Sequence, residues 1–530
     1  MIYARQGRRG MVSAPHHLAA EAGVDILRAG GNAVEAMVAA AAAIAVVYPH
    51  MNAIGGDGFW LIAEPGKDPV GIDASGGAAG LASIDFYREQ GLEQIPARGP
   101  LAALTCAGTV AGWGAALRHA STWGKALPRE ELMAAAVRHG KEGVCVTRGQ
   151  EGLTREKLPE LLDSPGFAAT YLDAGGEVLP EGALLKQPAL AASLEQLGRA
   201  GFDDFYRGDL ARSLAKGLES VGSPLRLSDL EAYLARPVEP LSVEIGSGKL
   251  HNMPPPTQGV SSLMILALFD RLGVREAESF DHIHGLVEAT KQAFILRNAS
   301  LADPKVMTTD PKAWLQSAFL DALASGIDRK RALPWPHQPK PGDTIWMGAA
   351  DAEGRVVSFI QSVYWEYGSG LVVPDTGILW QNRGTAFSLD PAHHNHLQPG
   401  LRPFHTLNPA LARLKDGRTL AYGNMGGEGQ PQSQSAVYSR HVLFGQDLQQ
   451  AVTAPRWLLG RTWGENTTTL KLESRFDPAL VEALRNAGHE VEVLEPFTST
   501  MGHAGAVAVS PEGRYEGASD PRSDGDAVAL

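Results

Sequence analysis

Apolar residues recur at helical spacing over the first part of the chain and alternate with polar residues in several later segments. Residues 11–50 begin with a strand-like stretch and continue as two segments with helical periodicity. Asn32 precedes the second of these segments and Glu35 follows three residues later, which is the arrangement of a capping box. The alanine-rich apolar run at 36–48 is shorter than the ~20 residues that span a bilayer. This pattern predicts a buried core helix and no membrane span.

Glycine turns, helical segments and β-patterned segments follow along the chain. I-G-G-D-G-F-W-L-I at 54–62 predicts a glycine turn that leads into an apolar strand, and residues 100–300 are largely helical in pattern. In P-P-P-T-Q-G at 254–259 the prolines favour an extended entry, and Gly259 allows a helix to begin at close range. We interpret this motif as packing. Residues 344–365 predict two strands joined by a D-A-E-G turn.

Length and composition narrow the classes of protein that fit. The chain has 530 residues, more than the ~250 to 300 at which single cores stop growing, so we expect a large layered domain or two intimate ones. A formal charge of -12 argues against nucleic acid as a partner and favours a small-molecule substrate. Cys106 and Cys145 are too few for a disulfide framework and lack metal-ligand spacing, so we expect both to be buried. We predict no metal and no cofactor.

The first residues carry charges, but no apolar run of signal-peptide length follows them. This start predicts a cytoplasmic protein.

A proline-rich stretch at 333–343 meets the β-patterned segment at Thr344. If the Thr344 hydroxyl attacked the Asp343 carbonyl and water hydrolysed the resulting ester, the new chain would begin with Thr344. Its α-amine, with an ordinary pKa of about 7.7 to 8.0, could then act as the base for its own hydroxyl. The alternative is an ordinary threonine at the start of a strand, since Asp-Thr pairs are common by chance.

Several stretches resemble the γ-glutamyltranspeptidase family of N-terminal nucleophile hydrolases. They are the opening M-V-S-A-P-H-H-L-A-A-E-A-G-V, the junction at Thr344, and G-A-S-D-P-R-S at 517–523. The resemblance implies an αββα sandwich of the α/β (α+β) class, with two stacked, mainly antiparallel sheets between helix layers. It also implies self-cleavage into a large subunit, 1–343, and a small subunit, 344–530, which together form one intertwined domain. The two cleaved chains would assemble as a heterodimer, which could pair further into a dimer of heterodimers.

The resemblance assigns catalytic roles to a few positions. Thr344 is the nucleophile, and Ser362 stands eighteen residues later, where the family keeps a threonine that orients the nucleophile. Gly426 and Gly427 match the paired glycines whose backbone N–H groups form the family's oxyanion hole. Loss of one such donor typically costs about 2.7 to 4 kcal/mol of transition-state stabilisation.

The positions that would bind a glutamyl group differ from the family pattern. Ile84 stands in place of the arginine that holds the α-carboxylate, and Ala386 in place of the acidic residue that holds the α-amino group. Tyr364 replaces an asparagine, and His405 with Thr406 replaces a serine pair. The remaining polar candidates for substrate binding are Tyr364, Arg383, His405, Thr406, Gln430 and Gln432. Arg383 could instead form a surface ion pair, and His405 could be a satisfied core histidine.

These differences resemble the branch of the family that hydrolyses other amides. We therefore expect an amide hydrolase that forms a threonyl ester and acts on a small acid amide, with oxamate favoured. Three alternatives stay open: γ-glutamyl transfer from glutathione-like donors, a cephalosporin-type acylase, and a non-catalytic binding protein that keeps the fold uncleaved.

Overall fold

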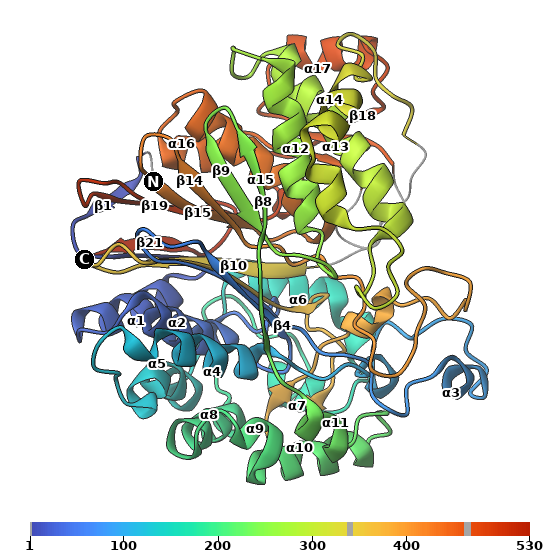
Figure 1. The fold of residues 1–530 in the computed structure, drawn as a ribbon. Helices are drawn as coiled ribbons and strands as arrows, with labels where there is room; N and C mark the ends of the chain where they lie inside the picture. Colours follow the sequence, from blue (N-terminus) through green and yellow to red (C-terminus); the bar gives the residue numbers. More distant parts are fainter. Residues whose placement is uncertain (1–2, 336–342, 461–467) are drawn as a thin grey trace.

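The computed structural model of the chain describes residues 3–335, 343–460 and 468–530. Two seven-stranded sheets lie face to face at its centre, and a layer of helices covers the outer face of each sheet (Figure 1). The strand pairs within these two sheets are antiparallel. The layer order is therefore helix, sheet, sheet, helix, which confirms the predicted αββα sandwich.

The first sheet ends next to the glycine pair of the predicted oxyanion hole, because its central strand β15 stops two residues before Gly426. In sheet order its strands are β1 (Arg5–Gly7), β20 (Tyr515–Ser519), β19 (Ala504–Val509), β15 (Thr419–Asn424), β14 (Ala410–Leu414), β9 (Gly248–Asn252) and β8 (Leu241–Ile245).

The second sheet carries the predicted nucleophile near the start of one of its central strands. In sheet order its strands are β21 (Asp526–Ala529), β2 (Met11–Ala14), β10 (Asp343–Ala350), β11 (Val356–Tyr364), β3 (Asp57–Ala63), β4 (Val70–Ala74) and β7 (Arg236–Val238). The hairpin of β10 and β11 confirms the two strands predicted after Thr344.

The two helix layers differ in which part of the chain forms them (Figure 1). The layer below the second sheet comes from the first half of the chain: α1 (His17–Arg28), α2 (Ala33–Val47), α4 (Thr109–His119), α5 (Arg129–Glu142), α6 (Arg148–Leu161), α7 (Phe167–Tyr171), α8 (Pro188–Ala200), α9 (Asp204–Arg207), α10 (Asp209–Ser220) and α11 (Leu227–Ala232). The layer above the first sheet comes from both halves: α12 (Gly259–Leu272), α13 (Phe280–Ser300), α14 (Ser317–Ser325), α15 (Gln430–Tyr438), α16 (Leu448–Thr453) and α17 (Pro478–Asn486).

Helix α2 shows how local sequence signals lead to this packing. The Asn32 side chain accepts a hydrogen bond from the Glu35 N–H, and the Glu35 carboxylate accepts one from the Asn32 N–H, so the predicted capping box is present. Every residue of α2 is buried, as the alanine-rich run predicted. Small side chains allow a close approach to α1, where a Cβ on Gly23 would lie 3.1 Å from the Ala36 carbonyl oxygen.

The helical interpretation of residues 100–300 was wrong for several short segments. The stretch contains β7, β8 and β9 and the small pair β5 (Val144–Cys145) and β6 (Leu184–Leu185). The signal was present in L-S-V-E-I of β8, whose residues alternate between buried and more exposed positions. The other small elements are α3 (Ile84–Arg88), β12 (Val372–Val373), β13 (Ile378–Leu379), β16 (Trp457–Leu459), β17 (Leu470–Glu473) and β18 (Val491–Leu494). Cys106 is buried as expected, but Cys145 on β5 is exposed.

The predicted cleavage junction lies within the second sheet. Strand β10 pairs with β2 on one side and with β11 on the other. In the first sheet, β14 from the C-terminal part pairs with β9 from the N-terminal part. Both sheets therefore contain strands from each side of Thr344. The proline-rich segment at 336–342 lies outside the described residues. Within the described ranges, no helix combines the length and the apolar character that crossing a bilayer requires.

Candidate active site

Thr344 is the second residue of β10 and lies where the pairing of β10 with β11 is irregular. Asp343 is opposite Tyr364 in the pairing of β10 with β11, and the register shifts between Asp343 and Ile345. Thr344 is fully buried. Tyr364 has φ 84°, a left-handed backbone conformation that non-glycine residues adopt only at a cost of about 1–3 kcal/mol. Such strained positions cluster at functional sites, and this one is directly opposite the bond that we expect to be cut.

The start of helix α15 brings the glycine pair to the same place. Gln430 is the first residue of α15, and its Nε2 donates a hydrogen bond to the Thr344 hydroxyl over 3.3 Å. Gly426 and Gly427 precede it with φ of 122° and 50°, values that favour glycine. Within the described ranges, their N–H groups have no hydrogen-bond acceptor. Free N–H groups before a helix suit an oxyanion.

Ser362 lies on β11, opposite Asp57 of β3. It is buried, and its hydroxyl accepts a hydrogen bond of 2.8 Å from the Tyr364 N–H. This bond fixes the backbone of the strained residue that faces the junction. A role in orienting Thr344 stays a prediction.

Arg383 is the buried cation of the site. It begins a short 3-10 helix, Arg383–Ala386, and its residue exposure is 1%. Its Nη2 donates to the Thr406 hydroxyl over 3.0 Å, and its guanidinium carbon lies 3.5 Å from the centre of the Tyr364 ring. The Nε and Nη1 atoms have no hydrogen-bond partner among the described residues. Burial lowers the pKa of Arg383 to about 10, although Tyr364 and Asp57 oppose the shift. The group is therefore charged at neutral pH, with donors left over for an anion, and the surface ion pair is wrong.

His405 is held by a carboxylate that sequence reasoning did not select. Its Nε2 donates to Asp57 over 3.1 Å, while its Nδ1 faces the Leu407 N–H at 3.4 Å. Burial, together with Arg383 and Arg402, holds the pKa of His405 well below its usual range. A neutral ring that already donates to a carboxylate is a satisfied core histidine. It is therefore a poor group for holding a second anion.

Asp57 is the first residue of β3, directly after the glycine turn, and is buried. Besides His405, it accepts hydrogen bonds from the N–H groups of Gly76 and Gly108 and from the Gln381 side chain. Burial raises the pKa of Asp57 to about 7, although the hydrogen bond from Gln381 and the charge of Arg383 oppose the rise. The sequence signal for Asp57 was its position as the one ionisable residue in the apolar stretch I-G-G-D-G-F-W-L-I.

The other candidates divide into members of the site and structural residues. Thr406 accepts from Arg383, and Asn408, two residues on, donates through its N–H and its side chain to Gln430. Arg383 and Thr344 are thus linked through one buried hydrogen-bonded path. Gln432, in contrast, exchanges two hydrogen bonds with the Leu459 backbone and is structural.

Ile84 and Ala386 stand at the two positions where the family binds the charges of a glutamyl group, and both side chains are apolar. Ile84 begins α3 and packs partly buried against the large core cluster. Ala386 is buried at the end of the short helix that Arg383 begins. Neither side chain can pair with a charged group.

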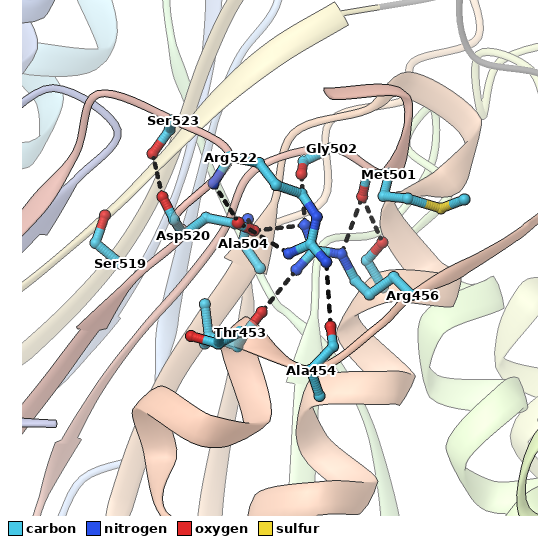
Figure 2. Close-up of polar contacts among 12 residues, drawn as sticks. Thr453, Ala454, Arg456, Met501, Gly502, Ala504, Ser519, Asp520, Arg522 and Ser523 are labelled. Carbon is cyan, nitrogen blue, oxygen red and sulfur yellow. Dashed lines mark hydrogen bonds and ion pairs between the residues drawn. The ribbon is translucent and has the colours of Figure 1, made fainter. Parts of the chain in front are cut away.

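Residues of the motif G-A-S-D-P-R-S form a buried polar network with Arg456 and with the segment at 501–504 (Figure 2). Asp520 bonds with Arg456 and Arg522, and Arg456 also donates to the Met501 and Gly502 carbonyls. Gly502 presses directly on the residue before Gly426, since a Cβ there would lie 1.9 Å from the Met425 carbonyl oxygen. The ionic network therefore holds the loop that packs against the segment leading into the glycine pair.

One group among the described residues has the side chains of a metal site. His284, Glu288 and His489 lie together, all buried. However, the two rings hydrogen-bond to each other over 2.9 Å, and Lys291 pairs with Glu288 over 2.7 Å. The lysine already neutralises the carboxylate, so a divalent cation would face a positive charge. These residues do not contact the candidate site in the hydrogen-bond network described above.

The site thus combines a buried hydroxyl, two backbone donors and one cation with free donors. This set suits attack on an amide that carries a carboxylate close to its carbonyl.

Known proteins are similar to this chain over almost its whole length. The family model for gamma-glutamyltranspeptidase matches residues 19–530. An oxamate amidohydrolase proenzyme from Klebsiella pneumoniae subsp. pneumoniae is 54% identical over 520 residues, 98% of this chain and 98% of that protein. A glutathione hydrolase-like YwrD proenzyme from Bacillus subtilis is 38% identical over 527 residues, 99% of each chain. A solved cephalosporin acylase from Bacillus halodurans matches with a TM-score of 0.90 at 31% identity, covering 99% of this chain and 97% of that one.

Proposed function

The chain belongs to the γ-glutamyltranspeptidase family, and on this premise we propose that it is a self-cleaving oxamate amidohydrolase. The family and the enzyme class, hydrolysis of amide carbon–nitrogen bonds, were both predicted from the sequence and are confirmed. The finer assignment rests on one observation: Arg383 is buried against Tyr364, which pairs with Asp343, and two of its guanidinium nitrogens have no hydrogen-bond partner among the described residues. A small acid amide supplies the missing anion.

Maturation begins with attack of the Thr344 hydroxyl on the Asp343 carbonyl. The Asp343–Thr344 amide bond breaks as an ester forms, and water hydrolyses this ester to a free carboxylate on Asp343 and a free hydroxyl on Thr344. The products are the chains 1–343 and 344–530. They stay together because both sheets contain strands from each chain.

Catalysis repeats the same chemistry on the substrate. The Thr344 α-amine accepts the hydroxyl proton as the oxygen attacks the amide carbon of oxamate, and the N–H groups of Gly426 and Gly427 bind the oxyanion. The carbon–nitrogen bond then breaks, and the amine returns the proton to the departing ammonia. Water hydrolyses the threonyl ester and releases oxalate. Ser362 and Gln430 orient the nucleophile during these steps.

The substrate carboxylate is bound by Arg383. Its Nη2 has two N–H bonds and donates one to Thr406, so the other can join Nε or Nη1 in two parallel hydrogen bonds to one carboxylate, the arrangement that makes arginine effective for such groups. Thr406 and Tyr364 hold the guanidinium in place from the other sides. A γ-glutamyl head would bring a carboxylate and an ammonium, and neither Ile84 nor Ala386 can pair with them. This difference disfavours glutathione as a substrate.

Two measurements test the proposal. Mass spectrometry should find chains of 343 and 187 residues, since 530 minus 343 leaves 187, and a single uncut chain in Thr344→Ala. The matured enzyme should release ammonia from oxamate, with kcat/KM about a thousandfold or more above that for a γ-glutamyl anilide, because both charges of the glutamyl head would be unpaired. Efficient turnover of the anilide without turnover of oxamate would restore the transpeptidase assignment.

Two further aspects belong to the same proposal. Cys106 and Cys145 are not joined to each other, which is consistent with a reducing compartment, and we place the enzyme in the cytoplasm. Association of two heterodimers stays a prediction.

A further inference from the structure

The motif P-P-P-T-Q-G contains a glutamine that joins the two halves of the candidate site. Gln258 is fully buried directly before helix α12. Its Nε2 donates to the Thr406 carbonyl over 2.8 Å and to the Gly427 carbonyl over 2.9 Å. Thr406 holds the carboxylate-binding Arg383, and Gly427 belongs to the oxyanion turn. One primary amide thus uses both of its N–H bonds to connect these two segments.

The acceptor end of the same amide is fixed as well. Gln258 Oε1 accepts a hydrogen bond of 2.8 Å from Arg297, and Arg297 forms a buried ion pair with Glu428, the neighbour of Gly427. The contacts close a ring that runs from Gly427 through Gln258 and Arg297 to Glu428 and back along the chain. The Arg297 guanidinium also lies 3.6 Å from the Phe294 ring centre, which limits its movement.

Backbone hydrogen bonds fix the segment before α12 to residues 405–406, which are next to the carboxylate-binding Arg383. The Gln258 N–H donates to the His405 carbonyl over 3.0 Å, and the His405 N–H donates to the Pro256 carbonyl over 2.8 Å. The segment before α12 is therefore docked on residues 405–406 independently of the side chain. A shift of the Gln258 side chain would move the oxyanion turn relative to this fixed edge.

We propose that Gln258 is a positioning residue that sets the distance between the carboxylate-binding group and the oxyanion hole. This inference rests on the proposed function and deepens it. In oxamate the carboxylate is bonded directly to the amide carbon, whereas malonamate has one methylene between them and succinamate has two. An enzyme that holds its two binding elements at one fixed separation selects substrates by the distance between carboxylate and amide carbon. The two hydrogen bonds from the Gln258 amide nitrogen fix this separation.

The test compares Gln258→Ala with Gln449→Ala. Gln449 is a matched control, because it is also buried and bridges two elements with both ends of its amide, at Ser519 and Thr453, without a hydrogen bond to Thr406 or to the glycine pair. In Gln258→Ala we expect kcat for oxamate to fall about 100-fold, as for a misplaced oxyanion donor. The ratio of kcat/KM for malonamate to that for oxamate should rise about tenfold, which is the usual discrimination by one methylene. Gln449→Ala should leave this ratio unchanged.

A second variant guards against simple loss of folding. Gln258→Asn keeps the amide but is one methylene shorter, so it can reach one carbonyl and not both. It should mature and should shift the substrate-length ratio in the same direction as Gln258→Ala. An unchanged ratio in a folded, matured Gln258→Asn, or an equal shift in Gln449→Ala, would overturn the inference.

Maturation separates this inference from the proposed function. Self-cleavage uses the oxyanion turn but no substrate carboxylate, so the precursor of Gln258→Ala should cleave more slowly than that of Gln449→Ala. If the wild-type enzyme fails to hydrolyse oxamate while this difference in maturation persists, the substrate assignment fails and the positioning of the turn stands. Equal maturation rates in both variants would contradict the positioning role.

Discussion

Two regions of the molecule bury arginine side chains, and they differ in what surrounds the guanidinium groups. In the network of Figure 2, the Arg456 and Arg522 side chains are 0% exposed, and Asp520 contacts both of them. Arg522 also binds Glu473 through two nitrogens. In the candidate site, Arg383 is almost as buried, but among the described residues it has one hydrogen-bond acceptor, the Thr406 hydroxyl, and one ring contact, with Tyr364.

The difference separates a structural charge from a binding charge. Burial lowers the pKa of Arg383 to about 10, and burial together with Arg522 lowers that of Arg456 to about 10 although Asp520 and Glu473 oppose the shift, so both guanidinium groups are strongly desolvated. The carboxylates around Arg456 offset this cost within the folded chain. The surroundings of Arg383 offset it only in part, and an uncompensated buried charge is costly. The presence of this charge in the candidate site is explained if a substrate anion pairs with it.

The largest effect should come from removing the binding charge. Arg383→Met should lower kcat/KM for oxamate about a thousandfold, because the substrate carboxylate would be buried without a partner. Its thermal stability should not fall, since the variant removes a poorly compensated charge. Steady-state kinetics and a melting curve on the matured protein check both statements. A large loss of stability with near-normal turnover would show that Arg383 stabilises the fold, as Arg456 does, and does not bind the substrate.

Removing the charge of Asp520 should lower stability and leave the substrate preference unchanged. Asp520→Asn should lower the free energy of unfolding by at least about 3 kcal/mol, because it leaves Arg456 and Arg522 without their shared carboxylate. The folded fraction should keep its preference for oxamate over longer acid amides. Denaturant unfolding and steady-state kinetics on the same sample would measure the loss of stability and the substrate preference together. A lost preference without lost stability would contradict the comparison.

A smaller effect should appear in the pH dependence of stability. Arg456 and Arg522 overcome the desolvation of Asp520 and lower its pKa from 3.8 to about 2. A depressed carboxyl pKa stabilises the fold above pH ~4, and this contribution of about 2 kcal/mol is lost as the pH falls through 2. The stability difference between wild type and Asp520→Asn should therefore shrink over that range. A difference that stays constant from pH 5 to about 2 would show that Asp520 is not ionised in the fold.

The smallest effect should come from His405. His405→Gln should change kcat/KM for oxamate by less than about tenfold, because the ring is neutral and already donates to Asp57. A loss as large as that in Arg383→Met would make His405 the carboxylate-binding group instead.

Local motifs made much of the fold and part of the site predictable. The capping box at Asn32, the strand after the glycine turn and the hairpin after Thr344 each depend on neighbouring residues, and each was found. Thr344 and the Gly426–Gly427 pair were selected through the family resemblance, and their catalytic roles stay predictions. Their assembly around one point is visible only in the fold, where Gln430 reaches the Thr344 hydroxyl.

The parts that could not be predicted depend on residues far apart in the chain. Asp57 and His405 are separated by 348 positions, so nothing local to either residue indicates the other. Gln258 was interpreted as packing because its partners Thr406 and Gly427 lie 148 and 169 residues away. The sequence selected Arg383 as a candidate but left a surface ion pair open, because the burial of Arg383 depends on contacts with Thr406 and Tyr364 that appear only in the fold.

The central claim, that Arg383 binds the carboxylate of a small acid amide beside Thr344, is tested most directly by comparing oxamate with oxamide. Oxamide has the same two-carbon skeleton but a neutral amide in place of the carboxylate. The matured wild-type enzyme should prefer oxamate in kcat/KM by about a thousandfold, and Arg383→Met should reduce this preference to nearly none. Equal kcat/KM values for the two compounds in the wild type, or a preference that survives in Arg383→Met, would contradict the account.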